Sequence, residues 1–289
     1  MTAKLEVLTP GLFATVQDLG RPGYTALGVG RSGAADRDAL RLANRLVGNP
    51  EGNAAVEATF GGLAVRFDGP TLIALTGAVG PARLGGRAIG PNAPVFVGAG
   101  EELRLGAPDR GLRTYLAVRG GIEVPPVLGG RGTDTLSGLG PAPLAAGTTL
   151  PVGHRVLAWP VVDQAPCAAI PDEPVLRLVP GPRLDFFTED ALGTLLSGRY
   201  AVSAQSNRVG LRLDGPVLRR AKSGEVPSEP AAPGAVQVPP SGQPILFLAD
   251  HPVTGGYPVV AVVAEEDLGG AAQARPGTRL RFVRSRLPG

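Results

Sequence analysis

Gln17, Asp18 and Arg21 form the first group of side chains in this chain whose types and spacing suit catalysis. The Asp18 carboxylate can act as a base or orient Arg21, and the Gln17 amide offers a donor and an acceptor to an amide or urea-like group. The Arg21 guanidinium can bind a carboxylate, phosphate or bicarbonate through two parallel hydrogen bonds. We therefore take Asp18 and Arg21 as candidate catalytic residues and Gln17 as a candidate substrate ligand. The alternative is that Asp18 and Arg21 brace the turn before Pro22 and Gly23.

Glu57 is an acidic residue inside the otherwise apolar stretch Ala55–Thr59. Burial in such a stretch would raise the pKa of its carboxyl group and suit it to acid–base catalysis, so it is a third catalytic candidate. A structural ion pair with an arginine would account for the same residue equally well.

A second group of candidates lies between Ser241 and Pro258. The apolar run Ile245–Ala249 is too short for a free helix and predicts a buried strand. In the turn that follows, two glycines can adopt positive φ and let a ligand approach the backbone, and successive N–H groups can bind an anion. The substrate-binding candidates here are the turn and two nearby glutamines: Thr254, Gly255, Gly256, Tyr257, Gln237 and Gln243. The alternative is a plain hairpin loop.

Asn207 and Arg208 lie between two predicted strands and are further substrate-binding candidates. Their alternative role is a hairpin turn, in which asparagine tolerates the left-handed conformation. His251 stands beside the glycine turn, where it could transfer a proton or be a surface loop histidine.

Other kinds of site have little support in the sequence. The G-x-G-x-x-G pattern from Gly28 to Gly33 precedes a predicted helix, whose N-terminus could bind an anion, but no apolar strand comes before it as a dinucleotide fold requires. No P-loop motif is present. Two histidines and the single Cys167 are too few for a metal site, so we predict no metal. Neither Lys4 nor Lys222 follows a methionine, so no covalent biotin is expected on this chain.

The composition indicates a β-rich globular protein. Of 289 residues, 43 are glycine and 30 are proline, which suits frequent tight turns, while 43% are apolar and occur in short runs. The net charge is only +3 and no basic run is present, so no nucleic-acid partner is expected. No leader-like segment and no run long enough to span a bilayer is present. A single cysteine fits a reducing compartment, and we expect a cytoplasmic protein without membrane association.

Many short strands and few helices must position these side chains. The strongest helix signal runs from Ala34 to Val47, where Ser32 or Asp36 can cap the start, and a shorter helix is expected after Thr188. Strands are expected at Leu5–Leu8, Leu63–Phe67, Thr71–Leu75, Val95–Val97, Leu103–Leu105, Arg113–Val118, Val175–Val179, Tyr200–Ala204, Val209–Leu213, Ala235–Val238, Ile245–Ala249, Val259–Val263 and Arg279–Val283.

The proline-rich stretch from Val161 to Pro174 predicts a linker between two subdomains. The N-terminal β-rich subdomain would cover residues 1–165, with one helix near 34–47, and the C-terminal subdomain residues 175–289. The longest loop is expected between Gly129 and Gly153.

Several blocks, in this order along the chain, resemble the allophanate hydrolase subunit 2 family, also called the biotin-dependent carboxyltransferase family. The blocks are Thr15–Arg21, Ser32–Asp36, Ala43–Asn49, Tyr115–Ile122, Ser206–Gly210, Ala235–Pro239 and Ser241–Pro258. Two positions depart from the family pattern, because Gly132 stands where a serine is usual and Pro230 where a glycine is usual. A hydroxyl role at position 132 is therefore excluded.

The resemblance implies a mainly β fold with a few short helices and a cyclophilin-like β-barrel architecture in two subdomains. Within the family it points to 5-oxoprolinase, in which a chain of this kind, with A-like and B-like partner subunits, opens 5-oxo-L-proline to L-glutamate. ATP would be bound only in the assembled complex, and the chain alone would be inactive. Two alternatives remain open. One is the carboxyltransferase component of a biotin-dependent urea or amide carboxylase, with biotin on another chain; the other is a non-catalytic regulatory partner of a kinase-inhibitor-like protein.

Overall fold

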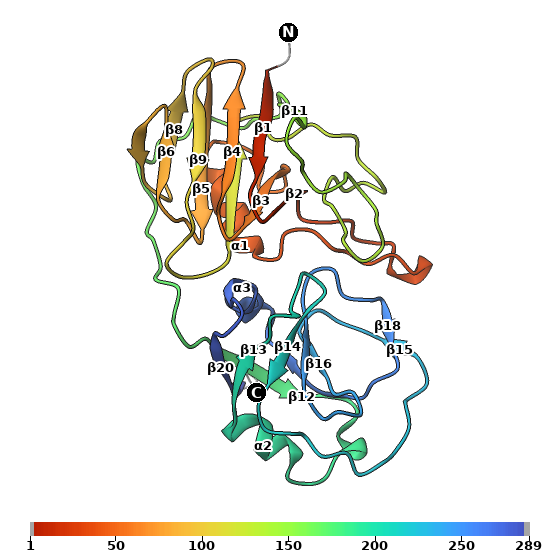
Figure 1. Cartoon of the computed structure of the whole chain (residues 1–289). Helices are drawn as coiled ribbons and strands as arrows, with labels where there is room; N and C mark the ends of the chain where they lie inside the picture. Colours follow the sequence, from red (N-terminus) through yellow and green to blue (C-terminus); the bar gives the residue numbers. More distant parts are fainter. Residues whose placement is uncertain (1–2, 286–289) are drawn as a thin grey trace. The chain divides into compact units, whose positions relative to one another are not determined.

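The computed structural model describes residues 3–285, and the chain divides into two compact units. The first contains the residues up to Arg21 together with Ser32–Asp134 and Gly138–Ile170. The second contains Pro22–Arg31, Thr135–Ser137 and the residues from Pro171 onward. Both are built mainly from β-strands, and the second includes a closed barrel, so the predicted fold class is confirmed (Figure 1).

The first unit contains two antiparallel sheets. In spatial order, the strands of the six-stranded sheet are β11 (Thr149–Pro151), β1 (Lys4–Pro10), β4 (Leu63–Phe67), β9 (Glu102–Leu105), β6 (Ala82–Leu84) and β7 (Arg87–Ile89). Those of the five-stranded sheet are β2 (Phe13–Gln17), β3 (Ala55–Thr59), β10 (Arg113–Val118), β5 (Thr71–Gly77) and β8 (Pro94–Val97). One apolar core takes side chains from both sheets, such as Val65 of β4 and Val56 of β3. The antiparallel pairing excludes the parallel crossovers of a dinucleotide fold.

Helix α1 (Arg37–Leu46) packs on the face of the five-stranded sheet that lies away from this core. Its apolar stripe includes Leu40 and Ala43, which are buried with Tyr115 and Ala74 of the sheet. Of the two predicted caps, Asp36 is the one used, since its carboxylate accepts a hydrogen bond from the backbone N–H of Ala39 at 3.1 Å.

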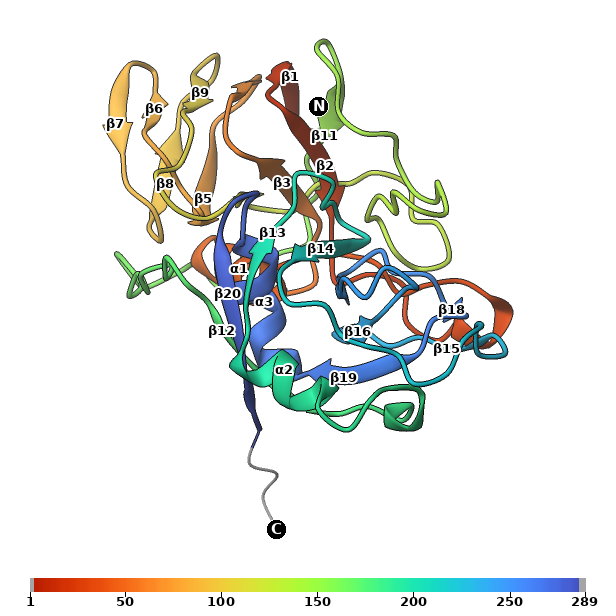
Figure 2. The same cartoon turned by 60° about the horizontal axis from the view of Figure 1, so that its bottom comes forward.

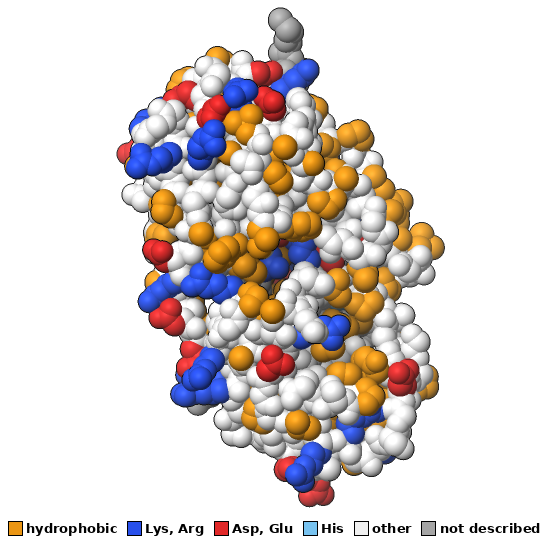
Figure 3. Space-filling model, viewed as in Figure 1, with side chains coloured by type: hydrophobic (Ala, Val, Ile, Leu, Met, Phe, Trp, Pro, Cys, Tyr) orange, Lys and Arg blue, Asp and Glu red, His pale blue; other side chains and the backbone are white. Residues whose placement is uncertain are grey.

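The outer surface of the six-stranded sheet carries ion pairs in which acidic and basic side chains alternate. Arg66 of β4 lies 3.3 Å from Glu6 of β1 and 2.7 Å from Glu102 of β9. Figure 3 shows blue and red side chains interspersed over this part of the first unit. Because these pairs are solvent-exposed, they contribute little to stability.

The second unit is a closed barrel. In spatial order its strands are β12 (Val175–Pro180), β19 (Val259–Val263), β16 (Ala235–Gln237), β17 (Ile245–Phe247), β14 (Gly210–Asp214), β13 (Arg199–Val202) and β20 (Arg279–Arg284). Strands β12 and β20 pair in parallel, whereas their neighbours pair antiparallel. Helices α2 (Ala191–Ser197) and α3 (Leu268–Gln273) contribute Leu195 and Ala271 to the barrel core, and both are visible in Figure 2. No helix within residues 3–285 is long and apolar enough to cross a membrane.

Several elements were not predicted from the sequence, and each has a weak local pattern. Strands β2 and β3 contain polar residues on a buried face, so they show no alternation of apolar and polar residues. The strands β6, β7 and β11 have three residues each, and β15 (Glu229–Pro230) and β18 (Thr254–Gly255) have two. Helix α3 contains two glycines, which lower helix propensity. At α2 the N-cap is Asp190 rather than Thr188, whose hydroxyl donates to the Arg219 carbonyl at 3.3 Å.

Candidate functional site

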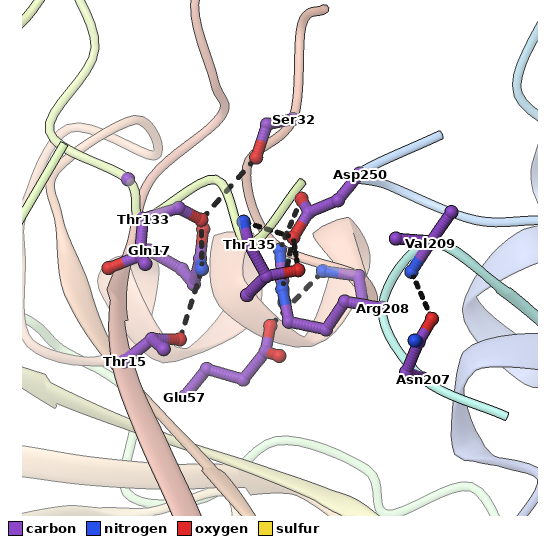
Figure 4. A network of polar contacts seen from close by, with 12 residues as sticks. Thr15, Gln17, Ser32, Glu57, Thr133, Thr135, Asn207, Arg208, Val209 and Asp250 are labelled. Carbon is purple, nitrogen blue, oxygen red and sulfur yellow. Dashed lines mark hydrogen bonds and ion pairs between the residues drawn. The ribbon is translucent and has the colours of Figure 1, made fainter. Parts of the chain in front are cut away.

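Gln17 ends strand β2 and is fully buried in the first unit. Its Nε2 donates to the Thr15 hydroxyl at 3.0 Å and to the Thr133 carbonyl at 2.9 Å, and the Ser32 hydroxyl donates to the same carbonyl at 3.4 Å (Figure 4). Within residues 3–285 the buried Gln17 Oε1 has no hydrogen-bond partner. A Cβ at Gly132 would lie 2.9 Å from this oxygen, so the glycine that replaces the family's serine keeps the space beside it clear.

Asp18 holds its own loop together. Its Oδ1 accepts a hydrogen bond from the Gly20 N–H at 2.8 Å, and its Oδ2 accepts one from the Arg131 N–H at 2.6 Å. Its backbone carbonyl accepts the Ala34 N–H at 2.8 Å. The carboxylate therefore ties residues 18–20 to the loop at 131, and a catalytic role for it stays a prediction.

Arg21 is buried with 0% of its surface exposed. Its Nη2 donates to the Gly132 carbonyl at 2.5 Å, and its Nε contacts the Val127 carbonyl at 3.4 Å. A Cβ at Gly140 would lie 2.2 Å from the same Gly132 carbonyl oxygen, so glycine is needed there for close approach. This geometry favours the alternative in which Arg21 braces the local backbone, and its predicted contact with an anionic substrate remains untested.

Glu57 lies on β3 and is 1% exposed. Its Oε2 accepts the Tyr115 hydroxyl proton at 2.7 Å and the Ala35 N–H at 3.1 Å, and its Oε1 lies 3.5 Å from Nε of Arg113. Burial, with a contribution from the Glu57 and Asp36 carboxylates, raises the pKa of Tyr115 well above its usual value. The phenol therefore stays protonated and donates a hydrogen bond to Glu57. The ion pair with an arginine is present, and acid–base catalysis by Glu57 stays a prediction.

Two of the candidates share one buried polar row on the face of the five-stranded sheet below α1. The strand register places Thr15 opposite Glu57 and Glu57 opposite Tyr115, and directly paired side chains point to the same face. Gln17 follows Thr15 by two residues and therefore points to the same face, and Thr76 extends the row beyond Tyr115. The sheet thus brings Gln17 and Glu57 into one layer, although 40 positions separate them in the sequence.

The N-terminus of α1, which follows the G-x-G-x-x-G pattern, is already occupied by protein groups. The Ala35 N–H donates to Glu57, the Asp36 N–H to the Tyr115 hydroxyl at 2.8 Å, and the Ala39 N–H to Asp36. The anion site predicted here is therefore not supported, because the donors that would bind an anion are already paired.

In the second unit Arg208 forms a buried two-point ion pair with Asp250. Arg208 Nε lies 2.9 Å from Oδ2 and its Nη2 lies 3.0 Å from Oδ1 (Figure 4). The Thr135 N–H and hydroxyl donate to the same Oδ2 at 3.0 and 2.7 Å. Sequence reasoning did not identify Asp250 as a partner, although its position inside the Ser241–Pro258 block was a signal for it.

Asn207 and Gln243 both support turns, and their side-chain hydrogen bonds go to residues outside the glycine loop. Asn207 Oδ1 accepts the N–H groups of Val209 at 2.8 Å and Gly210 at 3.4 Å (Figure 4). Gln243 accepts the Gly215 N–H at 3.1 Å and donates to the Gly215 carbonyl at 3.2 Å. For Asn207 this is the turn alternative, and ligand binding by either residue stays a prediction.

The loop that contains Gly255 and Gly256 differs from the predicted hairpin. Strands β17 and β19 pair with β16 on either side and not with each other, and the loop between them forms the short β18–β15 ladder. Neither glycine has a positive φ, so the conformational reason given for them is wrong. Both glycines lie close to polar side-chain ends instead: a Cβ at Gly255 would lie 2.6 Å from Gln237 Nε2, and one at Gly256 would lie 3.2 Å from Glu225 Oε2.

Gln237 on β16 lies beside this loop, at Gly255. It is 5% exposed, and within residues 3–285 its side-chain amide has no hydrogen-bond partner. Thr254 is exposed and Tyr257 is half-buried in the same loop. The loop and Gln237 therefore form a polar site, in which the Gln237 amide can hydrogen-bond to a ligand.

His251 is buried, not a surface histidine. Its ring stacks on Phe247 with centroids 5.8 Å apart, and its Nδ1 lies 2.7 Å from the Pro252 carbonyl oxygen. In the described part of the chain, no three His, Cys, Asp or Glu side chains are grouped to hold a metal ion.

Comparison with known proteins places this fold and these residues in a family. The model of the carboxyltransferase domain, subdomain A and B, matches residues 27–284. The C subunit of 5-oxoprolinase from Escherichia coli is 38% identical over 98% of this chain and 92% of its own length. The urea amidolyase of Lachancea kluyveri is 33% identical over 96% of this chain, which spans only 17% of that protein.

A solved structure agrees with these sequence matches. The crystal structure of the K. lactis urea amidolyase superposes with a TM-score of 0.91 at 31% identity, covering 98% of this chain and 19% of that one. The resemblance stated from the sequence blocks is thus confirmed. This chain belongs to the family of the carboxyltransferase domain, subdomain A and B.

Proposed function

We propose that this chain is the C subunit of a 5-oxoprolinase. In this reaction the lactam of 5-oxo-L-proline is opened by water to L-glutamate, and ATP is hydrolysed to ADP and phosphate. The similarity over nearly the full length of two proteins named as C subunits of 5-oxoprolinase, from Escherichia coli and Haemophilus influenzae, supports the proposal. The chain would act with A-like and B-like partner subunits, in the cytoplasm.

The Gln237 amide is the structural observation that carries the proposal. Gln237 is 5% exposed, and its amide has no hydrogen-bond partner among the described residues, so its donors and its acceptor can serve a ligand. A carboxamide offers two donor hydrogens and one acceptor oxygen, which match the C=O and N–H of a lactam. The glycine at 255 leaves the space beside this amide free of a side chain. We therefore infer that Gln237 binds the lactam group, with Thr254 and Tyr257 near it.

ATP binding by this chain itself has no support in the residues that the structure describes. There is no P-loop motif, and the N–H groups at the start of α1 are paired with Glu57, Tyr115 and Asp36. We propose that the nucleotide is held by the partner subunits in the assembled complex.

A second candidate is a carboxyltransferase acting on urea or a related amide, with biotin on another chain. The TM-score of 0.91 with the K. lactis urea amidolyase favours it. Gln237 would serve this reaction as well, because urea presents the same donor and acceptor groups as a lactam.

Reconstitution tests the proposal. The chain is combined with A-like and B-like proteins from the same genome, and phosphate release and glutamate formation are measured with 5-oxoproline. Wild-type complex should form glutamate, and Gln237→Leu should lower kcat/KM by about 10- to 100-fold because a buried amide contact is lost. Gln205→Leu, which removes an exposed amide in the same unit, is the matched control and should keep wild-type turnover.

Two results would contradict this assignment in different ways. Absence of 5-oxoproline turnover, with carboxylation of urea when carboxybiotin is supplied, would replace the first function with the second. Full turnover by Gln237→Leu would keep the reaction but remove Gln237 from the substrate site.

A further inference from the structure

An apolar groove in the first unit lies apart from the candidate residues described above. It has a volume of about 460 Å³, and its two aromatic lining residues are exposed to solvent. Its walls come from β5, the edge strand β8, the end of β10 and the segment 152–159. Its lining includes Thr71, Leu72, Phe96, Arg119, His154 and Trp159.

Arg119 is fixed in this groove by the end of α1. Its Nη1 donates to the carbonyl of Val47, the C-cap residue, at 2.7 Å and to the Ala158 carbonyl at 3.4 Å. Cations are favoured at a helix C-terminus, and the guanidinium also lies over the Trp159 ring at 4.6 Å from its centroid. Among residues 3–285, Nε and Nη2 of Arg119 have no hydrogen-bond partner. The groove therefore holds an oriented guanidinium whose Nε and Nη2 can donate hydrogen bonds to a ligand.

The segment that carries Trp159 is docked on the chain by close backbone contact. The Leu157 N–H donates to the Gly48 carbonyl at 2.8 Å. A Cβ at Gly48 would lie 2.3 Å from the Ala158 oxygen and 2.4 Å from Arg119 Nη1, and its φ is +68°. Glycine at this position thus permits the contact, and the groove wall is preformed.

The exposed side chains of the groove are large and apolar. Phe96 is 60% exposed and Trp159 is 63% exposed, and Leu157 next to them is also exposed. Exposed aromatic residues beside an arginine are typical of the residues that dominate binding at protein interfaces. None of the described residues that line the groove is acidic, and the charged one is Arg119.

We infer that this groove is the docking surface for the B-like subunit, which inserts an acidic side chain next to an apolar one. The carboxylate would bind the Nε and Nη2 edge of Arg119, and the apolar side chain would cover Phe96 and Trp159. The inference rests on the proposed function, which requires partners. It is also supported by the relatives, in which the matching region is either a named subunit or a small part of a much longer chain.

The single tryptophan of this chain gives a probe of the groove that is independent of activity. The chain is labelled with fluorotryptophan, mixed with the purified B-like subunit from the same genome, and followed by fluorine NMR and by isothermal titration. We expect the Trp159 resonance to shift on binding. Phe96→Ser should weaken binding by at least about tenfold, as expected for an anchor residue. Leu12→Ala, which removes a 74% exposed side chain of the same unit outside the groove, should not.

A pair of charge variants tests the sign of the partner's contact without touching Arg119, whose removal would also loosen the end of α1. Thr71→Glu should weaken binding by at least about tenfold, whereas Thr71→Lys should leave it unchanged or tighter. A complex that forms with an unshifted Trp159 resonance and equal affinity for Phe96→Ser overturns the docking surface and leaves the proposed 5-oxoprolinase function standing. If wild-type chain forms no complex at all, both fall.

Discussion

Replacing Arg21 with alanine should lower the free energy of unfolding of the first unit. We expect this loss in the isolated chain, where no substrate is bound. Arg21 is fully buried and donates to the carbonyls of Gly132 and Val127, so the substitution removes the side-chain donor of the Gly132 carbonyl, whereas the Val127 carbonyl keeps the Gly130 N–H. Both acceptors lie in the loop that Asp18 also holds through Arg131.

The magnitude follows from three contributions. A hydrogen bond from a charged donor, as to Gly132, contributes about 1.5–3 kcal/mol, and the longer Val127 contact less. The cavity left by a large buried side chain adds about 2 kcal/mol. Wild-type Arg21 also carries one buried nitrogen, Nη1, that has no partner within residues 3–285, and removing it returns about 1–2 kcal/mol. The net loss in the free energy of unfolding should be about 3 kcal/mol.

Urea unfolding of the isolated chain, followed by circular dichroism, measures this loss as a shift in midpoint at unchanged slope. The control is Arg45→Ala, which removes an exposed arginine paired with Glu51 and should cost less than about 1 kcal/mol. The bracing role of Arg21 would be refuted if Arg21→Ala lost under about 1 kcal/mol while the reconstituted complex lost its turnover.

Further substitutions test other parts of the molecule. Glu57→Gln should lower the free energy of unfolding by about 2 kcal/mol, seen as a lower urea midpoint, because it weakens the hydrogen bond from Tyr115 and removes the charge beside a buried arginine. Asp250→Ala should cost about 3–5 kcal/mol by leaving Arg208 buried without its carboxylate, and a double-mutant cycle with Arg208→Ala should show strong coupling; additive losses would contradict the pair. Burial raises the pKa of Tyr200 from 10.0 to about 12, so the unfolded chain loses this proton first. Stability should be complete below pH 10 and fall by at most about 1.4 kcal/mol per pH unit up to about pH 12, less steeply in Tyr200→Phe, as urea midpoints at pH 9 and 11 would show. Gly256→Val should reduce kcat/KM of the assembled complex by about tenfold with little change in the circular dichroism of the isolated chain, because its side chain would crowd Glu225; near-wild-type turnover would remove the loop from the site.

The apolar strands could be predicted from the sequence because their alternation or continuity is local. Strands β10 and β19 have the predicted bounds, and α1 uses one of the two predicted caps. Strands β2 and β3 could not be recognised, because Gln17 and Glu57 interrupt the apolar pattern. Their polar side chains are tolerated only because Tyr115, Thr133 and α1 supply hydrogen bonds from distant parts of the chain.

The candidate site was predictable in its residue types and only partly in its geometry. A sequence indicates that an arginine can bind an anion, but it does not indicate which anion the fold already supplies. For Arg208 that anion is the Asp250 carboxylate, and for Arg21 the partners are backbone carbonyls. Conversely, the Gln237 amide lacks a hydrogen-bond partner among the described residues because of how the barrel strands are arranged, and no local sequence pattern predicts that arrangement.

The division of the sequence between the two units has a consequence for how the protein is made. The chain passes from one unit to the other after Arg21, Arg31, Asp134, Ser137 and Ile170. During synthesis the first unit is therefore complete once residue 170 has left the ribosome. Segments 22–31 and 135–137 of the second unit, by contrast, stay without their partners until the barrel strands emerge.

Thr135 precedes Asp250 by 115 residues, and its hydroxyl donates to the Asp250 carboxylate only after the barrel strands have been made. Such long closures slow folding, and they also mean that no single cut separates two self-sufficient halves. A fragment beginning at Pro171 would lack Thr135 and would expose the Asp250 carboxylate that this threonine covers, so the barrel is best produced only as part of the whole chain.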